Sequence, residues 1–317
     1  MSRIAAVVVL VAALVTQAFA LTEDFSSNPF GNWSFGVGDN SNSQFTWNSA
    51  APAVYTGDAV GSLSVHLDSS LPTARFQRPL GATVTDTDSF TLKTRFSFDV
   101  TSAGSSDFMQ LAFGLVNSSL TGGNRTGTMP SFGDATTFHT VEFNYFPNVS
   151  TFGGPTLSPA VFGAQKGGSD AFGNFAAYFL SEADLGDNTI GVTALPQSVT
   201  LEASLNYNGA TKSLALTMNR VEPDGSLTPL NIEQPPLSLT TLPPFANYDA
   251  GFPFAVDALA IMAYRDAADF VPASVSLVAD LTFQQFEFAT ALVPEPGLAG
   301  LLVLGSASVF FWRQRRR

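Results

Sequence analysis

Alternation of apolar and polar residues with a period of two is the feature that most limits the fold of this chain. In Ser89–Val100 apolar residues recur at alternate positions, and polar or charged residues lie between them. Because successive side chains of a strand point to opposite faces, this pattern predicts a half-buried β-strand. Val60–Leu67 shows the same pattern. Phe108–Val116 is more evenly apolar, which is typical of a central strand.

A β-hairpin is predicted for Ser198–Arg220. Asn208 and Gly209 separate two alternating runs, and this dipeptide is the strongest short hairpin signal. A two-residue turn there would place Leu201 opposite Leu216, with the apolar residues of both strands on one face.

The last strand is predicted to change phase in its middle. Apolar residues alternate through residues 275–283, and Phe286 and Phe288 continue in the opposite phase. One extra residue in a strand produces such a change, so we expect a β-bulge at Gln284 and Gln285.

The strands are expected to form one all-β domain over residues 21–290. Helix-forming residues are scarce outside the two chain ends, and the prediction pairs the first stretch, Leu21–Phe25, with the last strand, Leu281–Phe288. Three long loops are predicted between the strands: Asn117–Ala135, Pro147–Asp170 and Glu222–Phe252. This arrangement resembles the concanavalin-A-like jelly-roll β-sandwich of legume lectins, laminin-G-like modules and laminarinase-type glycoside hydrolases.

The charge balance excludes some classes of partner. The chain has 26 acidic and 14 basic residues, and several of the basic ones lie in its terminal segments. The central domain is therefore strongly acidic, which disfavours binding to nucleic acid and to anionic lipid. The chain has no cysteine, so disulfides and thiol chemistry are excluded.

The first 20 residues are predicted to be a signal peptide. Arg3 is a short positive region, Ile4–Val15 is apolar, and Ala18-Phe19-Ala20 is an A-x-A cleavage site. We expect the mature chain to begin at Leu21. A short N-terminal membrane anchor is the alternative.

Three sequence features follow one another at the C-terminus, over residues 293–317. A Pro-Glu-Pro element precedes an apolar run, Gly297–Trp312, and a basic end. The run would span about 24 Å as a helix, and the arginines would hold its end on the cytoplasmic side. The Pro-Glu-Pro element and the basic residues of the end are Pro294, Glu295, Pro296, Arg313, Arg315, Arg316 and Arg317.

These features resemble the PEP-CTERM sorting signal of Gram-negative bacteria. The resemblance implies an exosortase as partner and cleavage beside the Pro-Glu-Pro element. It also implies a transmembrane helix that anchors the protein transiently in the inner membrane. The final location would then be the cell surface or the extracellular matrix. A permanent C-terminal anchor that is never processed is the alternative.

One segment resembles the metal-binding strand of legume lectins, V-E-F-D-T-[FY]-x-N. The resemblance implies ligand positions at Glu142, Asn144, the carbonyl of Phe146, and Asn148. Asn144 stands where that family has a bridging Asp, and no His follows at the family distance. Because calcium requires six to eight oxygens, several of them charged, the set is incomplete. An ordinary strand is the alternative, and we predict no cofactor, with calcium kept as a test.

The same strand bears on catalysis. Laminarinase-type hydrolases carry two glutamates there, and retaining chemistry needs two carboxyl groups close together. Glu142 has no second Glu at that spacing. We therefore predict that the protein is not an enzyme.

Aromatic residues in the predicted loops suggest a sugar-binding platform formed by Trp33, Trp47 and Tyr248. The alternative is that these rings belong to the core, since the chain uses 29 Phe throughout. The sequence thus predicts an exported, non-catalytic protein that binds exopolysaccharide. A structural surface protein without a small ligand, and a glycoside hydrolase with an unrecognised site, remain alternatives.

Overall fold

The computed structural model describes the strands and the turns next to them. The described residues are 17–35, 45–49, 61–68, 74–100, 109–119, 139–146, 156–162, 175–177, 198–230, 236–240, 254–265 and 278–292. Among these residues, no helix is long and apolar enough to cross a membrane. The predicted sorting signal, residues 293–317, lies outside the described residues.

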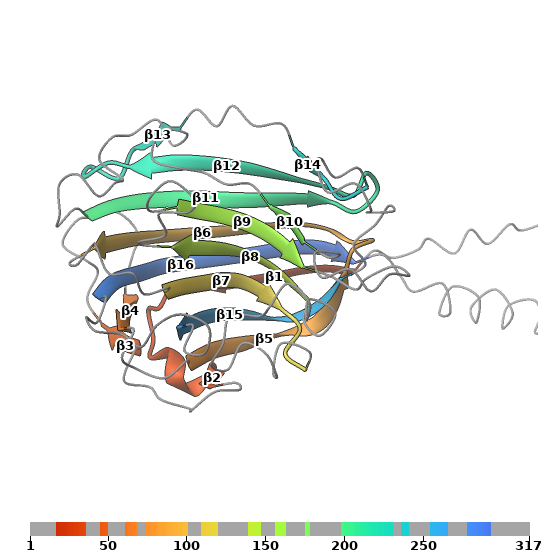
Figure 1. Cartoon of the computed structure of the whole chain (residues 1–317). Coiled ribbons are helices and arrows are strands. Elements are labelled where there is room, and N and C mark those ends of the chain that lie inside the picture. The colour runs from red at the N-terminus through yellow and green to blue at the C-terminus, as the bar shows by residue number, and fades with distance from the viewer. Residues whose placement is uncertain are drawn as a thin grey trace, which may run out of the picture.

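The chain folds into two antiparallel sheets, and the strand axes of the two sheets are roughly aligned with each other (Figure 1). Sheet A has nine strands: β1 (Gln17–Glu23), β3 (Phe45–Asn48), β4 (Ser62–Asp68), β6 (Ser89–Val100), β11 (Ser198–Asn208), β12 (Ser213–Val221), β13 (Leu227–Pro229), β14 (Leu237–Ser238) and β16 (Val278–Leu292). Sheet B has seven: β2 (Ser34–Phe35), β5 (Ala74–Thr85), β7 (Met109–Val116), β8 (Thr140–Phe146), β9 (Thr156–Phe162), β10 (Phe175–Ala177) and β15 (Ala255–Arg265). A 3₁₀ turn, Pro29–Gly31, precedes β2.

The core lies between the two sheets and is dominated by phenylalanine. Phe113 of sheet B packs against Phe96 and Phe283 of sheet A, with ring centroids 4.9 and 5.0 Å apart. All three side chains are fully buried. Apolar area removed from water is the main force that holds such layers together. The prediction of an all-β, antiparallel protein is confirmed.

The alternating pattern correctly located the strands that form the centre of each sheet. β6 has the predicted bounds, and its residues Phe90, Leu92 and Phe96 are buried. The predicted strand in residues 60–67 is β4. The predicted central strand is β7, which has buried residues on both faces.

The first and last strands pair as predicted, because β1 lies beside β16. β6 borders one edge of β16 along most of its length, so β4 and β1 share the other edge. The register of β16 against β6 shifts between Phe283 and Gln285, which confirms the predicted bulge. β1 begins at Gln17, inside the predicted signal peptide, and its first four residues pair with residues 289–292.

The register predicted for the hairpin is wrong. β11 and β12 do form a hairpin, but Leu201 lies opposite Arg220, and Asn208 opposite Ser213. The turn is longer than two residues because Oδ1 of Asn208 accepts hydrogen bonds from the backbone N–H groups of Ala210 and Thr211. The apolar residues still share one face, since the register changes by an even number of residues.

Two of the three long segments predicted as loops contain strands. β9 lies inside the predicted loop Pro147–Asp170, and β13 and β14 lie inside Glu222–Phe252. Two further strands, β5 and β15, were not predicted from the sequence, although they are neighbours in the centre of sheet B. β15 is apolar on both faces, so it shows no clean alternation.

Candidate functional site

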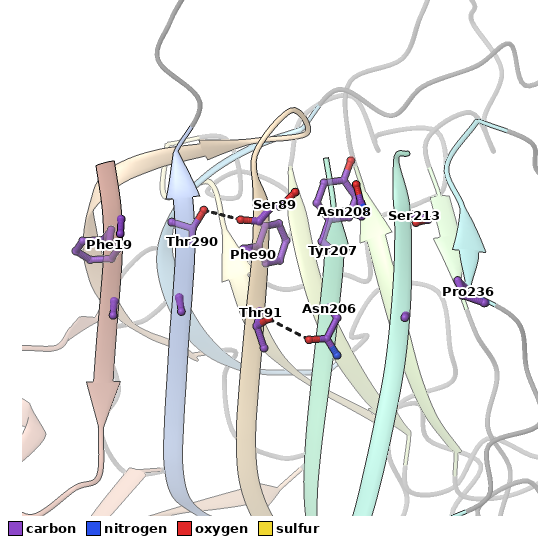
Figure 2. A pocket seen from close by; sticks show the side chains of 14 residues that line it. Phe19, Ser89, Phe90, Thr91, Asn206, Tyr207, Asn208, Ser213, Pro236 and Thr290 are labelled. Atoms are coloured by element: carbon purple, nitrogen blue, oxygen red, sulfur yellow. Dashed lines mark hydrogen bonds between the residues drawn. The ribbon is translucent and has the colours of Figure 1, made fainter. Parts of the chain in front are cut away.

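The surface of sheet A that faces away from the core is hollowed at one end. The hollow has a volume of about 730 Å³. It crosses β1, β16, β6, β11 and β12 and reaches the residue before β14 (Figure 2). Its lining residues are Ala18, Phe19, Ala20, Ser89, Phe90, Thr91, Asn206, Tyr207, Asn208, Ser213, Ala215, Pro236, Ala289 and Thr290.

Small side chains from successive strands form the floor of this hollow. The registers place one outward residue of each strand in a single row perpendicular to the strands. The row consists of Ala20, Ala289, Thr91, Asn206 and Ala215. We call these five residues the transverse row. Each is exposed or half-buried, because the inward positions of the same strands supply the core.

A hydrogen bond inside the row orients its one amide. The hydroxyl of Thr91 donates to Oδ1 of Asn206 over 3.0 Å (Figure 2). Nδ2 of Asn206 has no acceptor among the described residues, so the donor stays available to a ligand. Hydrogen-bond groups fixed in this way fit hydroxyl-rich ligands, because a hydroxyl both donates and accepts.

The inward neighbours of the row support it rigidly from below. The rings of Phe90 and Tyr207 stack with centroids 5.1 Å apart, and both side chains are buried. The Tyr207 hydroxyl donates to the carbonyl of Asp86 over 2.8 Å. Burial raises the pKa of Tyr207 far above its usual value, and the negative charges of Asp86 and Asp88 raise it further. The phenol therefore remains a neutral donor.

Two turns meet at the end of the hollow. Nζ of Lys212 binds the carboxylate of Asp86 at 2.6 Å, which joins the β11–β12 turn to the β5–β6 turn. Gly209 lies so close to the backbone of Thr87 and Asp88 that a Cβ atom there would clash. A glycine is therefore required at this position, and the turns hold the ends of β6 and β11 together.

A charged ridge borders the hollow on the side opposite to these two turns. Nζ of Lys93 lies 3.1 Å from Glu287, and the guanidinium of Arg95 lies 2.7 Å from Glu202. Lys93 and Glu287 occupy the next outward positions of β6 and β16 after the row, and Arg95 and Glu202 lie two residues further along β6 and β11. Among the described residues that line the hollow itself, none carries a charge.

Of the three residues of the predicted aromatic platform, Trp33 does not lie at the surface. Trp33 is in the core, 3% exposed, and stacks on Phe76 with ring centroids 5.1 Å apart. Its ring N–H donates to the buried carboxylate of Glu23 over 2.8 Å. Trp47 is half-buried, and its ring N–H donates to the carbonyl of Phe25. Tyr248 lies outside the described residues.

The residues of the predicted metal strand lie in β8 and beyond it. Glu142 is fully buried on the face of sheet B that points away from the core, directly opposite Gly114. The structure describes Asn144 and Phe146 only as strand backbone, and Asn148 lies outside the described residues. No group of three or more His, Cys, Asp or Glu among the described residues could hold a metal ion.

The residues of the hollow were not predicted from the sequence. Thr91, Asn206 and Ala215 stand at outward positions of correctly predicted strands, where small or polar residues are ordinary. The available signal was the run of uncharged outward residues at the end of each strand, next to charged ones such as Lys93 and Glu287. That signal becomes specific only when the register between strands is known.

Comparisons by sequence do not assign this chain to a family: no protein-family model and no curated protein matches it. Comparison of structures finds distant similarities. Peanut lectin with a bound nonapeptide has a TM-score of 0.38 and 10% identity, over 88% of this chain and 99% of that one. The metal-free lectin I-B4 from Griffonia simplicifolia has a TM-score of 0.41 and 15% identity, over 86% and 99%.

One of the structures similar to this chain, at a comparable TM-score, is that of an enzyme. The carbohydrate esterase vb_24B_21 from Shiga toxin-encoding bacteriophage phi24B has a TM-score of 0.39 and 16% identity, over 88% of this chain and 99% of that one. Legume lectins are thus among the structural neighbours, and the neighbours are not all lectins. With TM-scores below 0.5, these similarities carry no argument about what the chain binds.

Proposed function

We propose that this protein is an exported surface or extracellular-matrix protein that binds a neutral exopolysaccharide, without catalysis, in the hollow of sheet A. The concanavalin-A-like assignment of the sandwich is part of the proposal. So is the C-terminal processing by an exosortase after transient anchoring in the inner membrane. The proposal needs no cofactor.

The observation that carries the proposal is the chemistry of the transverse row. The row offers an oriented amide N–H, a hydroxyl and three alanine methyl groups on an open face. Two of these methyl groups, on Ala289 and Ala215, lie in the part of the chain that remains after the predicted signal-peptide cleavage. Pyranose rings have the matching surface, because their hydroxyls project at the edge and their C–H groups form apolar faces. Sites for small molecules commonly combine an apolar floor with a few fixed polar groups.

The charge pattern supports a neutral ligand. None of the described residues that line the hollow is charged, and the chain as a whole has a formal charge of −12. An acidic polysaccharide would be repelled by this field and would meet no cation among the described lining residues. A nucleic acid is disfavoured for the same reason.

The experiment is a binding titration of the full chain, purified in detergent, against neutral and acidic polysaccharides. Ala215→Arg places a long side chain over the row, and Thr217→Arg places the same side chain two residues further along β12, outside the hollow. We expect Ala215→Arg to weaken binding of a neutral polysaccharide by about tenfold, or about 1.4 kcal/mol. Thr217→Arg is expected to bind as the unmodified chain does.

Thermal melts of both variants verify that each one folds. If no neutral polysaccharide binds the unmodified chain, the proposed function is wrong. Equal binding by the two variants would instead move the site away from the hollow.

A further inference from the structure

We infer that the hollow binds internal stretches of a linear neutral polysaccharide, laid across the strands, and not chain ends or single sugars. This inference rests on the proposed function and adds the class of ligand and its direction. It depends on the registers of sheet A, which are set by residues far apart in the sequence.

The direction of the ligand follows from the boundaries of the hollow. The charged ridge, with Lys93 and Glu287, lies along one side, and the turn around Gly209 lies at the other. On β16 and β6, an elongated ligand laid along the strands would meet Glu287 or Lys93 at one end. The transverse row crosses the strands without a charged side chain among the described lining residues, so the inferred ligand lies along the row.

At both ends of the row the described side chains are small or compact. Ala20 on β1 stands at one end, and Ala215 on β12 at the other, followed by Pro236 before β14. None of these small or compact side chains closes the path, and Ala20 and Pro236 are exposed. A polymer can therefore continue past both ends, which a blind pocket for a chain terminus would prevent.

The length of the row sets how many sugar units it contacts. Neighbouring strands lie about 4.8 Å apart, so five strands give a row of about 19 Å from first to last. A pyranose unit in an extended chain is about as long as one strand spacing, so each strand faces roughly one unit. Cleavage of the predicted signal peptide after Ala20 would remove the β1 position and leave four strands.

The test is a titration of the full chain with a size series of linear oligosaccharides from the neutral polysaccharide that binds. We expect affinity to rise with each added unit and to level off at about four or five units. Oligosaccharides with a reduced and chemically tagged end should bind as well as unmodified ones. Single sugars should not compete.

Two variants each place an arginine side chain in the row, on opposite sides of the pair Thr91 and Asn206. Ala289→Arg blocks the row at β16, and Ala215→Arg blocks it at β12. Each should lower the oligosaccharide size at which affinity levels off, and the shortest oligosaccharide that binds should keep its affinity. A general loss of structure would lower the affinity for all sizes together.

The outcomes separate this inference from the proposed function. If no member of the series and no neutral polysaccharide binds, the proposed function itself fails. If the polysaccharide binds but affinity levels off at one or two units, or if tagging the end abolishes binding, the function stands and the transverse site is wrong. An effect of only one of the two arginine variants would also contradict it, since it would indicate a closed pocket.

Discussion

Thr91 on β6 and Asn206 on β11 are 115 residues apart in the sequence, and the hydroxyl of the first donates to Oδ1 of the second over 3.0 Å. This bond fixes the side from which Asn206 presents its amide nitrogen. The pair sits at the centre of the transverse row, so it connects the fold of sheet A with the proposed site.

Asn206→Asp tests the amide directly. The substitution keeps the shape and the oxygen that accepts from Thr91, but it replaces the donor with a charged acceptor. We expect binding of the neutral polysaccharide to weaken by about tenfold, as measured by titration calorimetry. The matched control is Asn219→Asp, which makes the same change on β12 outside the hollow. Equal effects of the two substitutions would contradict a specific role for Asn206.

Gln284→Met should stabilise the protein. Gln284 is 1% exposed at the bulge of β16, and neither Oε1 nor Nε2 has a hydrogen-bond partner among the described residues. A buried polar group without a partner costs about 1–3 kcal/mol, and methionine fills a similar volume without that cost. We expect a gain of this size in the free energy of unfolding, measured by denaturant titration.

The neighbouring amide provides the control for that substitution. Gln285 is half-buried and donates to Glu287, so Gln285→Met removes a satisfied hydrogen bond. It should leave stability unchanged or slightly lower. A loss of stability in Gln284→Met would show that the amide is satisfied in the folded protein.

Gly114→Ala should destabilise sheet B strongly. Gly114 has a φ of +152°, and a Cβ atom there would lie 2.5 Å from the carbonyl oxygen of Val141 and 2.6 Å from Cα of Glu142. Both are backbone atoms, which cannot move aside without shifting β8. We expect a loss of about 3 kcal/mol in the free energy of unfolding, measured by denaturant titration. Gly31→Ala is the control, because a Cβ atom at that position would have no neighbour within 4 Å.

His139 should make stability depend on pH. Burial lowers the pKa of its imidazole below the usual value, and its Nδ1 accepts a 3.0 Å hydrogen bond from the backbone N–H of Ala255. Because the folded state favours the neutral ring, this stability is fully present above the unfolded pKa of about 6.5. It is lost as pH falls from there through the lower folded pKa.

Thermal melts from about pH 7.5 to about pH 5, a range that brackets the unfolded pKa, measure this dependence. His139→Gln should flatten the pH profile, because a Gln side chain has no titrating group. His66 is exposed, and its Nδ1 lies 2.7 Å from the carboxylate of Asp280. His66→Gln leaves His139 in place, so it should retain the loss at low pH. A profile that His139→Gln leaves unchanged would contradict the assignment.

The strands that could be predicted from the sequence are those in which alternating apolar and polar residues indicate burial of one face. β6 alternates cleanly, so its bounds were found, and the change of phase at Gln284 revealed the bulge. β15 could not be found in this way, because both of its faces are apolar. The hairpin register also depends on tertiary contacts: Lys212 binds Asp86, and Gly209 packs against the β5–β6 turn.

The candidate site could not be predicted because its residues become neighbours only through register. Ala20, Thr91, Asn206 and Ala289 come from four distant parts of the chain, and each one alone looks like an ordinary outward residue. Trp33 illustrates the opposite error. Its size and position suggested a binding surface, but the carboxylate of Glu23 satisfies its N–H inside the core.

Hydrogen–deuterium exchange of the full chain, with and without a neutral polysaccharide, would locate the ligand on the fold without any substitution. We predict slower exchange at the ends of β6 and β11 that border the hollow, residues 89–91 and 206–208, and no change in β8. Protection of β8 around Glu142, with none at β6 and β11, would contradict the proposed site and place the ligand on sheet B.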